Sequence, residues 1–236
     1  MMSFIKRTVV SLLSLVFVVA LAGYWLQDDL QIYREDLIYY GLCHIKLVGW
    51  SMFWALVIGV PAGTVLSRPR FAGFAEKIIQ IFNVGNAIPT MAVLALALVL
   101  FGIGDVPAIL ALVLASLLPI VRNTYEGLVR TSPALLEAAK GVGMTPNQSL
   151  FKVELPNAIP IIIGGVRTAL AINVGTAPLS FIIGGDSLGG LIFPGIYLNN
   201  QGQLLLGALA TALLALFLDS LVALFGHVML RRRGLA

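Results

Sequence analysis

Charged residues that lie inside long apolar stretches are the first candidates for chemistry in this sequence. Arg167 and Asp219 each interrupt such a stretch, where a charge is costly unless it is paired or reaches water. We interpret the two as a structural ion pair. The alternative is that Arg167 alone extends to the inner aqueous interface. In the same way we expect Lys46 at the outer interface, and we expect His44 to be interfacial too.

A second group consists of uncharged polar residues within apolar stretches. Such residues can line a path for a polar solute, or they can form hydrogen bonds between neighbouring helices. Both interpretations remain open for Asn83, Asn86, Thr90, Asn173 and Thr176.

The residues needed for catalysis or for cofactor binding do not occur in recognisable patterns. Cys43 is the only cysteine, so the chain can form neither an internal disulfide nor a cysteine-rich metal site. We find no arrangement of acids, histidines and nucleophiles that an enzyme would require. The phosphate-binding pattern G-x-x-x-x-G-K-[ST] is also missing. We therefore expect neither enzymatic activity nor a bound cofactor in this chain.

The elements that carry these residues must lie in a membrane. Of the 236 residues, 59% are hydrophobic and only 11% are charged, and the mean hydropathy is +0.97, whereas soluble domains are about one quarter charged. The net charge of +4 comes from small basic groups between apolar stretches, which indicates membrane topology rather than nucleic-acid binding. The stretches are too long for the strands of a barrel, so we expect an all-α membrane protein.

The apolar stretches predict about six transmembrane helices, since one crossing takes about 20 residues. They are Thr8 to Trp25, Leu47 to Leu66, Ile78 to Phe101, Val106 to Val121, Ala158 to Ile183 and Leu204 to Phe225. The first stretch also has the features of a signal peptide, with Ala20-Leu21-Ala22 as the cleavage site. We favour a transmembrane helix.

The distribution of charge predicts the orientation. Most lysines and arginines lie on alternate connections, and the opposite connections carry mainly acids, including Asp36, Asp105 and Asp186. Because positively charged loops stay in the cytoplasm, both termini are expected there. The chain then divides into an N-terminal helix with an external segment (1–40), a core of about five transmembrane helices (41–230) and a basic cytoplasmic tail (231–236).

One cytoplasmic connection, within which we define the 131–156 loop, is much longer than the others. Ser132 and Pro133 are typical of a helix start, and Gly141 and Gly143 are typical of its end. Thr145-Pro146 begins a second helix by the same logic, and we expect it to stop at Leu155, before Pro156 and Pro160. This helix-turn-helix is a candidate site for a partner.

The same loop contains a recognisable motif. Its residues follow the pattern E-A-A-x3-G-x9-I-x-L-P, with valine in place of isoleucine: Glu137, Ala138, Ala139, Gly143, Val153, Leu155 and Pro156. The chain thus resembles the permease subunits of type I ABC importers, in which this segment is the coupling helix that docks into the ATPase. The resemblance implies a cytoplasmic ABC ATPase dimer that binds ATP and Mg²⁺, a second permease subunit, identical or paralogous, and a separate extracytoplasmic binding protein. It also implies the bacterial inner membrane.

Further segments narrow the resemblance to permeases for quaternary-ammonium osmoprotectants such as glycine betaine, choline and carnitine. They include residues 86–90, 101–109, 118–124, 164–168, 173–177 and 187–192. One departure is Ile183-Gly184-Gly185-Asp186, where relatives commonly read I-G-A-G. The alternatives are an ABC permease for an amino acid such as methionine, and a secondary transporter. The latter predicts inverted repeats or broken-helix ion sites, and we find neither in the sequence.

Overall fold

A computed structural model of the protein describes residues 26–232, without the side chains of residues 84–86 and 232. The predicted helix Thr8 to Trp25, the cleavage site at Ala20-Leu21-Ala22 and the side chain of Asn86 lie outside the described residues. So do residues 233–236 of the predicted basic tail.

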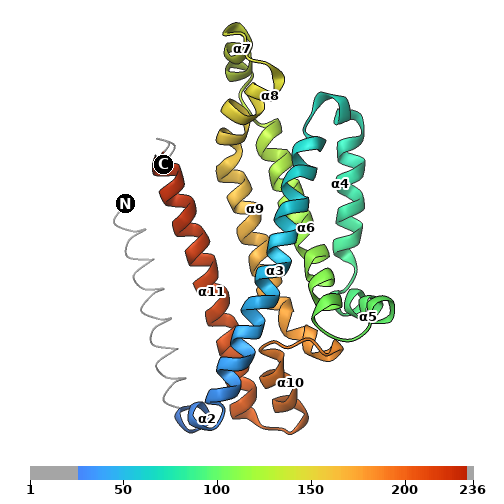
Figure 1. The fold of residues 1–236 in the computed structure, drawn as a ribbon, viewed down its shortest axis with the longest axis vertical. Helices are drawn as coiled ribbons and strands as arrows, with labels where there is room; N and C mark the ends of the chain where they lie inside the picture. The colour runs from blue at the N-terminus through green and yellow to red at the C-terminus, as the bar shows by residue number, and fades with distance from the viewer. Residues whose placement is uncertain (1–25, 233–236) are drawn as a thin grey trace.

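Every regular element in the described range is helical (Figure 1). In chain order the elements are α2 (Gln27–Ile32), α3 (Arg34–Leu66), η1 (Pro69–Phe71), α4 (Ala72–Ala87), α5 (Thr90–Phe101), α6 (Asp105–Val129), α7 (Pro133–Gly141), α8 (Pro146–Ser149), η2 (Leu150–Glu154), α9 (Leu155–Thr176), η3 (Ala177–Ile183), α10 (Gly189–Tyr197) and α11 (Gln201–Arg232).

Four helical segments in this range are long and apolar enough to cross a membrane. They are Arg34–Leu66, Asp105–Val129, the continuous segment Pro146–Ile183, and Gln201–Arg231, and a shorter apolar helix covers Thr90–Phe101. The expected single crossing from Ile78 to Phe101 is wrong, because the helix is interrupted between α4 and α5. Pro89 occupies the N-cap of α5 in an extended conformation, and as a proline it offers no N–H to continue α4. The described residues therefore provide fewer full-length crossings than the predicted count of about six.

The centre of the molecule is the packing of α3 and α9 on either side of α6. Their buried residues form one apolar cluster that includes Leu47, Leu112, Ile120 and Val174. Glycine brings the backbones close at both contacts: a Cβ added to Gly63 would lie 2.6 Å from the Val121 carbonyl oxygen, and one added to Gly165 would lie 2.7 Å from that of Pro119. The three helices thus form a tight unit in which small residues set the spacing.

The two ends of the bundle carry different elements. In Figure 1, α7 and α8 lie at one end, and α2, α5 and α10 lie at the other. At the latter end Lys46 approaches Asp105 at 3.4 Å, and the Tyr39 hydroxyl donates a hydrogen bond of 2.8 Å to Asp186. These two acids therefore lie at the end opposite the 131–156 loop.

His44, which we expected at the membrane interface, points into the helix bundle. Its side chain is fully buried, and neither ring nitrogen has a hydrogen-bond partner among the described residues. The neighbouring Lys46 is exposed, as expected for an interfacial residue. The two residues lie on different faces of α3, because positions two apart on a helix point in different directions.

Candidate functional site: the 131–156 loop

The first half of the 131–156 loop is an exposed helix with one buried side. Glu137 and Ala138 of α7 are exposed, and Ala139 is buried. Ser132 occupies the N-cap position, but its side chain makes no capping hydrogen bond. The predicted cap is therefore only positional, and Pro133 at the first helical position begins the helix with a preset φ. Helix α7 offers its outer face to a partner.

The turn after α7 depends on the backbone of Gly143. Its φ is +77°, a left-handed conformation that glycine adopts at little cost. The Gly143 N–H donates to the Lys140 carbonyl at 2.9 Å, and the Met144 N–H donates to the Ala139 carbonyl at 3.0 Å. This pair of hydrogen bonds is a Schellman motif. A Cβ at Gly143 would meet no atom within 4 Å, so the requirement for glycine within this chain is conformational.

The second half of the loop begins with a capping box. The Thr145 hydroxyl accepts from the Gln148 N–H at 3.3 Å, and the Gln148 side chain accepts from the Thr145 N–H at 2.9 Å. These reciprocal bonds satisfy amide groups that the start of a helix leaves free. They position α8 beside the turn that follows α7.

The predicted helix break at Pro156 is wrong, since α8, η2 and α9 form one continuous helical segment. Residues 150–154 form a π-helical turn (the π-turn) that ends two residues before Pro156. This wider turn brings the chain into α9 past a residue that has no N–H to donate. The side-chain amide of Asn157 donates to the Val153 carbonyl at 2.7 Å, which satisfies one acceptor next to the proline.

The motif residues of the second half are packed rather than free. Val153, Leu155 and Pro156 are half-buried. On the same segment, Leu150 and Ala158 form a buried cluster with Leu128 of α6. The motif therefore divides into an exposed part, Glu137 to Gly143, and a packed base, Val153 to Pro156.

Sequence reasoning missed the ion pair that attaches this base to α3. The Arg68 Nη2 lies 2.7 Å from the Glu154 Oε2, and Glu154 is 9% exposed. The two residues are 86 positions apart, so no local pattern joins them. The available signal was an acid inside a basic connection, directly before Leu155-Pro156.

The structure brings Arg167 and Asp219 together, as the sequence interpretation expected. The Arg167 Nε and Nη2 each lie 2.7 Å from an Asp219 carboxylate oxygen. This two-point contact joins α9 to α11. Both side chains are about half-exposed and border an open cleft of about 420 Å³, which Gly164, Thr168 and Ala171 also line.

The uncharged polar residues separate into two kinds. Asn173 is fully buried; it accepts from the Ser51 Oγ at 2.9 Å and donates to the Ser116 Oγ at 2.8 Å. It therefore joins α3, α6 and α9, and the alternative of helix–helix hydrogen bonding describes it better than a position on a path. Thr176 donates to the Ile172 carbonyl of its own helix at 2.8 Å, and Asn83 donates to Gln80 at 3.1 Å.

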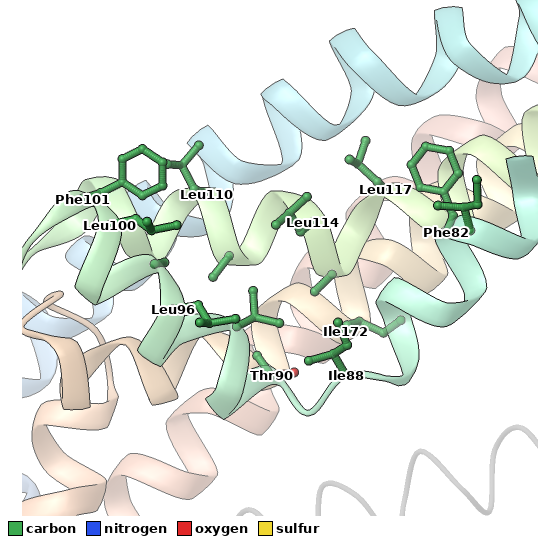
Figure 2. Close-up of a pocket in the computed structure, with 15 residues that line it drawn as sticks. Phe82, Ile88, Thr90, Leu96, Leu100, Phe101, Leu110, Leu114, Leu117 and Ile172 are labelled. Carbon is green, nitrogen blue, oxygen red and sulfur yellow. The ribbon is translucent and has the colours of Figure 1, made fainter.

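Thr90 is the predicted path residue that faces an open space. It lines a cavity of about 380 Å³ between α4, α5 and α6, to which α9 contributes Ile172. Figure 2 shows the labelled side chains around this space, among them Phe82, Leu96 and Leu114. All lining residues except Thr90 are apolar. The cavity can therefore provide hydrophobic contact but no fixed charge.

The described residues form a bundle of apolar helices with a helical hairpin, α7 and α8, at one end. Residues 55–232 match the family model of the binding-protein-dependent transport system inner membrane component, and the chain belongs to this family. It is therefore a membrane permease component and not an enzyme. The match includes the whole 131–156 loop.

Three similar proteins illustrate the relationship. The osmoprotectant import permease protein OsmY of Salmonella typhimurium is 60% identical over 200 residues, which is 85% of each chain. The choline transport system permease protein OpuBB of Bacillus subtilis is 39% identical over 82% of this chain and 88% of its own. Among solved structures, an inward-facing form of the MetNI methionine ABC transporter aligns with a TM-score of 0.68 and 26% identity, over 83% of this chain and 95% of that chain.

Proposed function

We propose that this chain is the permease subunit of an ATP-driven importer for an osmoprotectant, with glycine betaine, choline and carnitine as the candidate solutes. The observation that carries the proposal is the 60% identity to an osmoprotectant import permease across 85% of both chains. A likeness of 26% identity to a methionine transporter supports the amino-acid alternative less strongly.

The proposed partner at the 131–156 loop is a cytoplasmic ABC ATPase dimer. The loop offers the exposed face of α7 and a rigid glycine turn, and the same end carries basic residues such as Arg70 and Arg130. ATP and Mg²⁺ would bind to the ATPase. A separate binding protein would dock at the opposite end, near Asp105 and Asp186, and both termini would lie in the cytoplasm.

The proposed path uses the apolar cavity beside Thr90, enclosed by a second permease subunit. A permanently charged solute cannot lose its charge, and an apolar wall with one hydroxyl holds such a solute weakly. Weak contact suits transport, because a solute that is bound tightly is released slowly. Selectivity for the solute would then reside mainly in the binding protein.

Uptake into proteoliposomes that contain the permease, its ATPase and its binding protein tests the substrate. We expect ATP-dependent accumulation of labelled glycine betaine, choline or carnitine, and none with an ATPase that cannot hydrolyse ATP. Accumulation of methionine with none of the three quaternary-ammonium solutes would favour the alternative.

Cysteine labelling tests the orientation. In a Cys43→Ser background, Ser149→Cys should resist a membrane-impermeant reagent in intact cells and react after the cells are opened. Asp186→Cys should react in intact cells once the reagent can cross the outer membrane. The reverse pattern would invert the proposed topology.

A further inference from the structure

The Arg68–Glu154 ion pair lies where the 131–156 loop enters the membrane bundle. Arg68 lies two residues after the end of α3, between α3 and η1, and Glu154 is the last residue of η2. Their side chains are 27% and 11% exposed, which makes this the most enclosed ion pair among residues 26–232. A carboxylate as buried as that of Glu154 depends on its partner, because an unpaired charge in a low dielectric is strongly destabilising.

The Arg68 side chain is also held by its own helix end. Its Nη2 donates to the Ser67 Oγ at 2.9 Å, and its Nε donates to the Thr64 carbonyl at 3.3 Å. The guanidinium is thus oriented before it meets Glu154, so little side-chain freedom is lost when the pair forms. Displacement of Glu154 would therefore act on the end of α3 rather than on a freely moving side chain.

The loop has three other connections to the bundle, and all lead elsewhere. Its first residue follows the end of α6 through Arg130. The unbroken segment Pro146–Ile183 connects it to α9, and the cluster of Leu128, Leu150 and Ala158 connects it to α6. Helix α3 runs from this end of the molecule to the opposite end, where Tyr39 contacts Asp186. A link from the loop to α3 would therefore reach both ends of the bundle.

We propose that the Arg68–Glu154 ion pair transmits movement of the 131–156 loop to α3, and that the two residues are positioning residues for coupling. The inference rests on the proposed docking of the ATPase at this loop. Movement of the loop reaches α9 through the backbone, α6 through the backbone and apolar packing, and α3 through this pair.

The test uses the complete complex of permease, ATPase and binding protein in proteoliposomes, with uptake and ATP hydrolysis measured together. Glu154→Gln keeps the shape of the side chain and removes the charge. We expect the complex to assemble while uptake per ATP hydrolysed falls about fivefold or more, the lower end of ordinary coupling between sites. Arg68→Lys keeps the charge and should retain most of the coupling.

Two further variants separate coupling from folding. The double variant Arg68→Gln with Glu154→Gln leaves no buried charge unpaired, so it should fold and remain uncoupled. The exchange Arg68→Glu with Glu154→Arg should recover part of the uptake per ATP. Arg122→Gln is the matched control, because Arg122 forms an exposed pair with Glu126 within α6, and it should leave the ratio unchanged.

Wild-type uptake per ATP in a folded double variant would overturn the proposal. So would a loss of folded complex with an unchanged ratio, which is the result expected of a purely structural pair. Cross-linking of Ala138→Cys to the ATPase in a background with the pair intact tests the docking separately. If the cross-link fails, the proposed function is at fault. If it forms and the pair variants stay coupled, only the link to α3 is wrong.

Discussion

The two parts of the 131–156 loop are built by different forces. From Glu137 to Gly143 the structure is set by local backbone hydrogen bonds, with most side chains exposed. From Leu150 to Pro156 it is set by burial of Leu150 against α6 and by the ion pair of Glu154 with Arg68 at the end of α3. Local bonds give a rigid shape that persists without a partner, and burial gives attachment to the bundle. A docking surface needs a rigid shape. A segment that transmits movement needs attachment to the bundle.

Gly143→Val should give the largest effect, by changing the exposed part alone. A β-branched residue is a strong outlier at the φ of +77° found there, so the turn must rearrange. We expect nearly complete loss of uptake with normal insertion and accumulation in the membrane. Asparagine tolerates this conformation better, so Gly143→Asn should retain more uptake than valine. Equal uptake by both variants and the wild type would remove the conformational role of this turn.

Leu150→Ala should affect the packed base instead. Removal of a buried leucine side chain costs roughly 2–5 kcal/mol, and Leu150 is 9% exposed. We expect a lower melting temperature of the purified permease, measured in detergent. Leu135→Ala, at a position on α7 that is 42% exposed, is the control. If both variants melt at the same temperature, the division into an exposed part and a packed base is wrong.

Asn173→Ala extends the comparison to the centre of the bundle. It removes the group that accepts from Ser51 and donates to Ser116, and a buried polar group left without its partner costs about 1–3 kcal/mol. Thr176→Val removes a bond within a single helix and should cost less. Thermal unfolding of the two variants measures the difference. A larger loss for Thr176→Val would contradict the central role of Asn173.

Neutralisation of Arg167 and Asp219 should give the smallest effect on stability. The pair borders an open cleft, and an ion pair that water reaches contributes about 1 kcal/mol or less. A double-mutant cycle with Arg167→Gln and Asp219→Asn, followed by thermal unfolding, gives the coupling energy. We expect a favourable value, with each single variant less stable than the double variant. Zero coupling would mean that the contact does not stabilise the protein.

The sequence was most informative where a feature is local or long. Hydropathy located α3, α6, α9 and α11, because a helix that crosses a membrane must be apolar over about 20 residues. The glycine turn at Gly143 was likewise predictable, since it depends on one backbone angle. Hydropathy does not show where one helix ends and the next begins, however. The sequence prediction therefore merged α4 and α5 into one crossing through Pro89. Hydropathy is also insensitive to which face of a helix is packed, so the burial of His44 could not be predicted from it.

Features that depend on distant partners could not be predicted. Nothing near Glu154 in the chain indicates that it meets Arg68, and nothing near Asn173 indicates that it meets Ser51 and Ser116. The pairing of Arg167 with Asp219 could be predicted because both interrupt long apolar stretches. Each was therefore the natural partner for the other. When a residue has many possible partners in the sequence, only the fold shows which of them it contacts.

The π-turn at Leu150–Glu154 has a consequence for rotation. Each residue of an α-helix advances the chain by about 100° around the helix axis, and a π-turn inserts one residue into that sequence. The faces of α8 and α9 are therefore out of phase by about 100°, although one helix runs through both. If this turn tightened to α geometry, α7 and α8 would rotate by about 100° around the axis of α9 and move about 1.5 Å along it. Docking at the hairpin could thus be converted into torque on a transmembrane helix.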